Sequence, residues 1–209
     1  MRFVLCVGLL LAAGCGTAPE PKKEAAPAAK KDAAASPVGA PETFQVRFDT
    51  SKGPFVVDVR REWAPRGADR FWELVRAGYF DDARFFRVVK NFVVQFGLAA
   101  NPATTRKWDK EIDDDPVLRT NRAGAVAFAK RGRHSRTTQI FINLRTNQSL
   151  DSQGFAPFGQ VVEGMAVVEK LYSGYGEAPE QELIRKRGNA YLAAQFPRLD
   201  FVKTAVVVE

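Results

Sequence analysis

Cysteine is nearly absent from this sequence of 209 residues. The only two cysteines, Cys6 and Cys15, lie close to the N-terminus, so the chain beyond them can form no disulfide, thiol nucleophile or thiolate metal site. Histidine occurs once, as His134 in a basic stretch, and we interpret it as a solvated loop residue rather than a ligand. The hydrophobic core must therefore supply the stability of the folded part.

A long hydrophobic run is lacking as well. The N-terminal run over residues 3–13 follows Arg2 and falls well short of the roughly 20 residues that a membrane-spanning helix needs. A positive charge, a short apolar core and small residues together predict a signal peptide over residues 1–14. The residues before Cys15 resemble the lipobox of bacterial lipoproteins, although Ala12 stands where leucine is usual. Cys15 would then carry lipid; the alternative is an ordinary signal peptide.

Residues 15–43 have the composition of a linker. Alanine, proline and lysine dominate them without apolar periodicity, so this stretch cannot bury enough surface to offset the entropy lost on ordering. We therefore expect a disordered tether between lipidated Cys15 and a folded domain over residues 44–209. This organisation predicts a monomeric lipoprotein of the bacterial cell envelope, anchored to the membrane and facing the periplasm.

A strong excess of one charge is also missing. The formal net charge is +7, from 31 basic and 24 acidic side chains, which is too mild for a dedicated nucleic-acid-binding protein. We therefore expect no nucleic-acid partner. Basic side chains concentrate in residues 130–136, where we expect a solvated rim. Alternatively, this rim biases a nearby site toward acidic peptides or anionic lipid head groups.

Hydrophobic periodicity predicts a mainly β domain. Residues 44–50 alternate apolar and polar side chains, and a turn then leads to the apolar run 55–59, as in a β-hairpin. Residues 65–77 place their apolar side chains on one helical face. The other expected elements are strands within 85–97, 125–129, 139–143, 155–162 and 201–208, a helix over 165–172, and a helical segment over 181–195 interrupted by Gly188. Eight short strands with two helices predict a closed antiparallel barrel capped by those helices.

Two segments are predicted as loops. Residues 98–121 are long, polar and contain proline, and residues 173–179 are rich in glycine. Asp113, Asp114 and Asp115 lie in the first loop, but three consecutive carboxylates do not match the alternating ligands of an EF-hand. We therefore interpret them as solvated loop residues rather than a calcium site.

Residues 85–97 raise the main functional question. They form two apolar runs joined by Lys90 and Asn91, yet they contain Arg87 and Gln95. A cation and an amide among aromatic residues cost free energy unless they are paired or used. Either Arg87 reaches the surface and Gln95 lies on a wet face, or both point into a dry aromatic pocket.

Five linked motifs resemble those of the cyclophilin family. Arg87, Phe92, Gln95 and Gly97 match its Arg, Phe, Gln and Gly pattern. The other four motifs follow in the family's order and at similar spacing, in residues 124–129, 138–142, 150–151 and 158–161. The resemblance covers the whole expected domain and implies a closed eight-stranded antiparallel cyclophilin-like barrel.

The resemblance also implies an activity, peptidyl-prolyl cis–trans isomerisation, which needs neither a cofactor nor a metal. The catalytic residues would be Arg87, which supplies the cation, together with Gln95 and Phe92. The residues implied to bind the substrate are Val93, Ala129, Lys130, Gln139, Phe141, Leu150 and Phe155. The expected partners are proline-containing peptides or unfolded exported proteins.

Two other functions could use the same features. A non-catalytic module that binds prolyl peptides, or a holdase chaperone, would need the aromatic pocket but not the cation. The presence of Arg87 therefore favours an enzyme. A domain that binds anionic surfaces or nucleic acid would rest on the basic residues 130–136 alone, and it predicts binding with a steep salt dependence.

Overall fold

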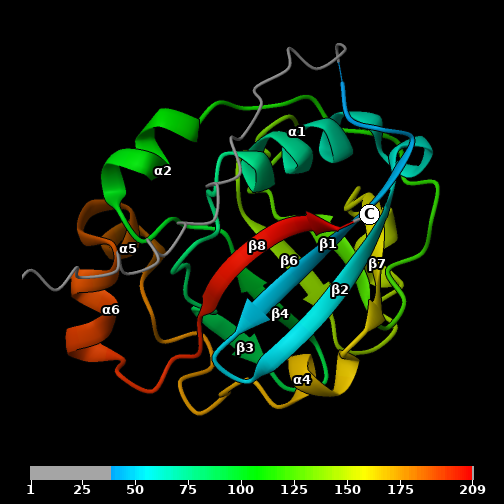
Figure 1. Cartoon of the computed structure of the whole chain (residues 1–209). Helices are drawn as coiled ribbons and strands as arrows, with labels where there is room; N and C mark the ends of the chain where they lie inside the picture. Colours follow the sequence, from blue (N-terminus) through cyan, green and yellow to red (C-terminus); the bar gives the residue numbers. More distant parts are fainter. Residues whose placement is uncertain (1–38, 209) are drawn as a thin grey trace, which may run out of the picture. The chain divides into compact units, whose positions relative to one another are not determined.

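The computed structural model of the chain describes residues 39–208. The predicted signal peptide, Cys15 and the linker as far as residue 38 lie outside the described residues. Within the described part, eight antiparallel strands form one curled sheet, and helices lie around it (Figure 1). None of the helices between residues 39 and 208 is long and apolar enough to cross a membrane.

The strands pair in the order β3-β4-β6-β5-β7-β2-β1-β8. Their bounds are β1 (Thr43–Thr50), β2 (Gly53–Arg60), β3 (Arg87–Val89), β4 (Val93–Phe96), β5 (Ala125–Phe128), β6 (Ile140–Asn143), β7 (Pro157–Glu163) and β8 (Val202–Val208). The expected strand count, direction and chain order are therefore confirmed. The predicted hairpin over 44–59 is the β1–β2 pair, in which Val46 lies opposite Val57.

The prediction of a closed barrel is wrong in one respect. β3 and β8 end the sheet, and no ladder of hydrogen bonds joins them. The two ends meet only around the starts of these strands. The contacts there are an isolated bridge between Arg84 and Phe201 and two backbone hydrogen bonds, from Phe85 N–H to Asp200 O at 3.0 Å and from Val202 N–H to Ala83 O at 2.9 Å. The sheet stays open beyond this point because β3 is only three residues long and pairs along its outer edge with another segment, described below.

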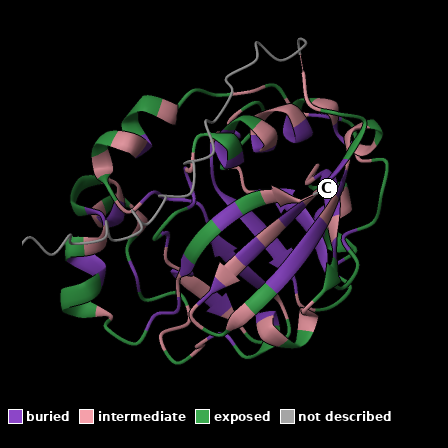
Figure 2. Ribbon diagram, in the orientation of Figure 1, coloured by how far each residue is buried: buried purple, intermediate pink, exposed green. Residues whose placement is uncertain are grey.

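The central strands bury both of their faces, as their colouring in Figure 2 shows. On β4, Val94 and Phe96 point into the main core, whereas Val93 belongs to a separate cluster on the opposite face. Strand neighbours alternate between faces, so Gln95 shares the face of Val93. Continuous apolar runs are expected for strands buried on both sides, which is why residues 85–97 contain so little polar sequence.

Six α-helices occur in the described residues, where two helices and a helical segment over 181–195 were predicted. They are α1 (Pro65–Arg76), α2 (Pro102–Trp108), α3 (Ser149–Ser152), α4 (Met165–Glu169), α5 (Gln181–Arg187) and α6 (Asn189–Gln195). α1 and α4, the two predicted helices, lie at opposite ends of the strands in Figure 1. The expected interruption at Gly188 separates α5 from α6 and has a φ of +56°, which glycine adopts without a steric penalty.

Two parts of the predicted solvated loops are instead buried. Asp115 is 5% exposed and Arg136 is 2% exposed, and Arg136 Nη1 lies 3.0 Å from Asp115 Oδ2. Asp115 also accepts hydrogen bonds from the N–H groups of Arg66 and Gly67 at the start of α1. These donors have no partner within a helix, so a remote carboxylate supplies the cap that the local sequence lacks. Asp113 is exposed, as expected.

The first described residues are tied to the domain by one carboxylate. Asp69 Oδ1 accepts from Ala40 N–H at 2.8 Å, and both Asp69 oxygens accept from Arg61, at 2.7 and 3.0 Å. Hydrogen bonds from Arg61 lower the pKa of Asp69, against the opposing effect of partial burial. The ordered chain therefore includes Ala40, a few residues before the predicted boundary at residue 44.

This pairing predicts acid sensitivity. Because the pKa of Asp69 is lower in the folded chain, its stabilisation is complete above the unfolded pKa of about 3.9 and is lost as the pH falls through the folded pKa. We expect the urea concentration at the unfolding midpoint of the wild type to decrease as the pH falls below about 4. The midpoint of Asp69→Asn should decrease less over the same pH range. Urea titrations between pH 2 and 7 measure this. Asp49→Asn, at an exposed strand carboxylate, is the control, and identical profiles for Asp69→Asn and wild type would contradict the prediction.

Candidate active site

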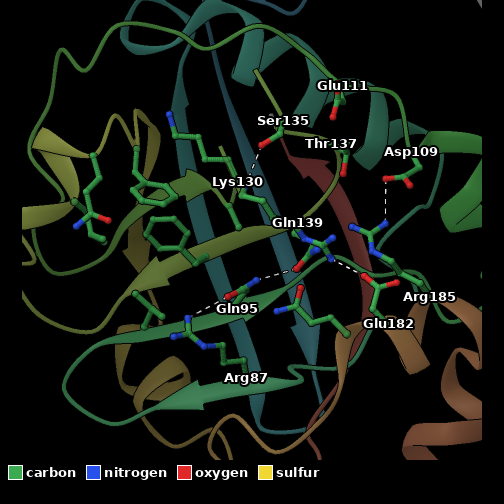
Figure 3. A pocket seen from close by; sticks show the side chains of 18 of the residues that line it. Arg87, Gln95, Asp109, Glu111, Lys130, Ser135, Thr137, Gln139, Glu182 and Arg185 are labelled. Carbon is green, nitrogen blue, oxygen red and sulfur yellow. Dashed lines mark hydrogen bonds and ion pairs between the residues drawn. The ribbon is translucent and has the colours of Figure 1, made fainter. Parts of the chain in front are cut away.

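A groove of about 590 Å³ lies on the outer face of β4, β5 and β6 (Figure 3). Its volume is within the range of small-ligand and peptide sites. The structure brings all ten residues predicted for the site into its lining: Arg87, Phe92, Val93, Gln95, Ala129, Lys130, Gln139, Phe141, Leu150 and Phe155. Predicted site residues up to 68 positions apart in the sequence, Arg87 and Phe155, thus share one cavity.

Strand register places the cation beside the amide. Arg87 on β3 is the direct partner of Gln95 on β4, and Gln95 is in turn the partner of Phe141 on β6. The turn between β3 and β4 depends on Asn91, which has a φ of +57°, a conformation that asparagine tolerates better than most residues. The predicted turn at Lys90 and Asn91 is therefore confirmed, and it sets the register that pairs Arg87 with Gln95.

A chain of hydrogen bonds fixes the orientation of the two glutamines. Arg87 Nη1 donates to Gln95 Oε1 at 3.1 Å, and Gln95 Nε2 donates to Gln139 Oε1 at 2.8 Å. Because a guanidinium can only donate, the oxygen of Gln95 must face it, and the oxygen of Gln139 must face the amide of Gln95. The relay therefore ends with the Gln139 NH₂ group, which can donate to the carbonyl of a bound peptide.

An apolar pocket lies next to this relay. Phe141 and Phe155 form an edge-to-face pair with ring centroids 5.6 Å apart, and both cluster with Val93 and Leu150. The Arg87 guanidinium carbon lies 5.5 Å from the centroid of the Phe92 ring, close enough for a cation–π interaction. The pocket offers a dry surface that can receive a compact apolar ring beside a cation.

Buried polar side chains hold the pocket wall in place. Asp151 accepts from the N–H and Nδ2 of Asn121 at 2.9 and 2.8 Å, and Asn121 Nδ2 also donates to Phe155 O. Asn147 Nδ2 donates to Phe92 O at 3.0 Å. Fully satisfied buried networks rigidify their surroundings, so the carbonyls of Phe92 and Phe155 are fixed from behind. No role for these asparagines was predicted from the sequence.

Lys130 is placed in the groove but is engaged elsewhere. Its Nζ donates to Asp114 Oδ2 at 2.9 Å and lies 5.7 Å from the Phe155 ring centroid, with the side chain 8% exposed. Burial alone would raise the pKa of Asp114, but hydrogen bonds from Lys130 and His134 N–H lower it. Lys130 therefore braces the edge of the pocket, and only Arg131, Arg133 and His134 match the expected solvated rim.

One part of the groove was missed by the sequence analysis. Its charged residues are Asp109, Glu111, Arg131, Glu182 and Arg185, and Figure 3 shows four of them gathered on the side nearest α5. Arg185 bonds Asp109 at 3.0 Å, and Arg131 bonds Glu182 at 2.7 Å, which lowers the pKa of Glu182. The helical pattern over 181–195 was visible in the sequence, but nothing in it indicated that α5 borders the site.

A family comparison agrees with this geometry. Residues 45–187 match the model of the cyclophilin type peptidyl-prolyl cis-trans isomerase/CLD family. A peptidyl-prolyl cis-trans isomerase of Arabidopsis thaliana, CYP18-2, is 36% identical over 148 residues, which are 66% of this chain and 85% of the relative.

Solved structures show the same fold. A cyclophilin type peptidyl-prolyl cis-trans isomerase of Cryptosporidium parvum superimposes with a TM-score of 0.62 at 20% identity, covering 80% of this chain and 98% of that one. A structure of the same protein in the presence of the dipeptide Ala-Pro gives 0.60, again at 20% identity, over 79% and 99% of the two chains. The chain belongs to the family of cyclophilin-type peptidyl-prolyl cis–trans isomerases.

Proposed function

We propose that this chain accelerates rotation about Xaa-Pro peptide bonds in exported or envelope proteins, with Arg87 stabilising the twisted amide. Family membership supports the isomerase activity. The observation that carries the role of Arg87 is its position: the guanidinium is bonded to Gln95 and borders the apolar pocket of Phe141 and Phe155. A proline ring in that pocket would have its nitrogen next to the cation.

The chemistry requires no covalent step. The barrier to rotation about a peptide bond is about 18–20 kcal/mol, because amide resonance is lost in the twisted state. In that state the prolyl nitrogen gains a lone pair, and a guanidinium N–H can bond to it only there, which is the condition for catalysis. Arginine suits this role because it stays protonated and donates from a rigid fork.

The energies are of the right size. Turnover on the millisecond timescale needs the barrier lowered by about 5–6 kcal/mol, and one charge-assisted hydrogen bond contributes roughly 1.5–3 kcal/mol. The remainder would come from the low-dielectric apolar pocket and from donors held in place before the substrate arrives, such as the Gln139 amide.

An isomerisation assay tests this proposal. Exchange NMR on an Ala-Pro peptide, with and without the purified protein, should show faster cis–trans exchange at substoichiometric protein. Peptide binding without acceleration would contradict the enzymatic proposal and favour the non-catalytic binding module. Neither binding nor acceleration would leave the basic residues 130–136 as the remaining candidate, to be tested by salt-dependent binding to anionic vesicles.

The site of action is a separate proposal that rests on the N-terminal sequence. The resemblance of the residues before Cys15 to a lipobox, and the linker composition that follows, support a lipid-anchored protein of the bacterial cell envelope. We expect the full-length protein to fractionate with membranes and Cys15→Ser to appear in the soluble fraction. Cys6→Ser, within the signal peptide, is the control and should stay membrane-bound. Membrane retention of Cys15→Ser would contradict lipidation at this residue.

A further inference from the structure

The Arg87 guanidinium has a second partner besides Gln95. Arg87 Nε donates to Glu177 Oε1 at 2.6 Å, and Nη2 forms an ion pair with the same oxygen. Glu177 lies 90 residues further along the chain, in the glycine-rich segment that the sequence analysis assigned only as a loop. Glu177 does not line the groove, whereas Arg87 does.

The segment that carries Glu177 is built against β3. Val88 N–H, on the outer edge of this end strand, donates to Gly176 O at 3.3 Å, and this contact occupies the edge that would otherwise continue the barrel. Gly176 has a φ of +53°, which favours glycine. The Tyr175 ring packs edge-on against Tyr172 and Phe196, with centroids 5.0 and 5.1 Å away. Glu177 thus projects from a turn anchored on both sides.

The geometry of the contacts leaves donors for a substrate. A guanidinium has five N–H groups. Glu177 engages Nε and one N–H of Nη2, and Gln95 engages one N–H of Nη1. One N–H on each terminal nitrogen therefore remains without a partner among the described residues. The carboxylate holds the edge of the guanidinium formed by Nε and Nη2, and Nη1 keeps a second N–H beside Gln95, which lines the groove.

We propose that Glu177 is a positioning residue for Arg87 in the isomerase reaction. The inference rests on the proposed function. Gln95 alone holds one end of a long side chain that is 24% exposed, and an arginine with one tether can rotate about its last bonds. A second tether at Nε fixes the plane of the guanidinium, so that its free N–H groups point to one place when the amide twists. Positioning of this kind acts on turnover more than on binding.

The test is a set of substitutions in the full-length protein, assayed by exchange NMR on an Ala-Pro peptide. Glu177→Ala should lower kcat roughly three- to tenfold while KM changes less than about twofold, because the apolar pocket is untouched. Glu177→Gln, which keeps an oxygen for Nε but not the charge, should lie between Glu177→Ala and wild type. Glu180→Gln is the matched control, since Glu180 is exposed three residues after Glu177 and does not line the groove.

Two further measurements separate positioning from a general structural role. In an Arg87→Ala background, Glu177→Ala should leave the residual rate unchanged, because the two residues act as one unit. The Arg87 Nε–H proton should exchange faster with water in Glu177→Ala and not in Glu180→Gln.

Several results would overturn the inference. An unchanged or raised kcat in Glu177→Ala would do so, and a raised kcat would mean that the carboxylate restrains the cation. An effect confined to KM, or the same loss in the Arg87→Ala background, would show a role other than positioning. An inactive wild type would overturn the proposed function together with this inference, whereas an active wild type with an unaffected Glu177→Ala variant would overturn the inference alone.

Discussion

Arg87→Ala should lower kcat/KM for an Ala-Pro peptide by about 10- to 150-fold. This range is the rate equivalent of one charge-assisted hydrogen bond of roughly 1.5–3 kcal/mol in the transition state. Truncation also removes the donor that orients Gln95 and leaves Glu177 without its cation, so the measured loss includes the reorganisation of both. Exchange NMR under saturating and subsaturating peptide separates kcat from KM, and most of the loss should fall on kcat.

Two comparisons make this experiment decisive. Arg87→Lys keeps the charge but cannot donate to Gln95 and Glu177 in a fixed plane while also facing the substrate, so its rate should lie closer to alanine than to wild type. Arg47→Ala removes a cation of β1 that is bonded to Asp49 and does not line the groove, and it should keep full activity. Equal rates for wild type and Arg87→Ala would remove the guanidinium from the mechanism.

Asp115→Ala should destabilise the domain by about 3–5 kcal/mol, a large part of the stability of an ordinary domain. The substitution removes the closest carboxylate partner of the buried Arg136 cation, which keeps only a longer ion pair with Asp114 at 3.5 Å. It also removes the acceptor for two N–H groups at the start of α1. Arg136 Nη2 would keep only its bond to Asp113 O. Urea unfolding at neutral pH, compared at equal m-value, measures the loss.

The control variant for Asp115→Ala lies in the loop that carries Arg136. Arg133→Ala removes an exposed cation three residues from Arg136 and should change stability by less than about 0.5 kcal/mol. A loss of less than about 1 kcal/mol in Asp115→Ala would show that water or a shifted side chain replaces the carboxylate. The buried pair of Asp115 and Arg136 would then contribute little to holding its loops against α1.

Strands of this fold could be predicted because each is a short apolar run between turn residues. Phe96 shows what such a pattern leaves out: its ring packs 4.8 to 5.8 Å from those of Phe48, Phe80 and Phe85, a role that no local pattern encodes. α2 was missed because residues 102–108 have no apolar stripe, although Asn101 and Pro102 form a helix start that the sequence does display. The outer edge of β3 bonds to Gly176, and this contact between distant parts of the chain cannot be predicted from a local sequence pattern.

The predicted residues of the site converge because the motif order fixes strands that become neighbours. Gln139 and Phe141, for example, lie on a run that pairs with β4, so one correct sheet brings them to Arg87. Contacts made by loops could not be predicted in the same way. Asp115 contacts Gly67, 48 positions away in the sequence, and Glu177 contacts Arg87, 90 positions away. No motif between these residues indicates that they are neighbours in the fold.

Neighbouring residues of β4 point to opposite faces of the sheet, and this alternation has an evolutionary consequence. Val94 and Phe96 serve the core, whereas Val93 and Gln95 face the groove. Substitutions at the first pair act on folding, and those at the second would act on the peptide that the proposed site accepts. Homologous proteins could therefore differ in substrate preference through substitutions at Val93 and Gln95, while Val94 and Phe96 are kept and preserve the fold.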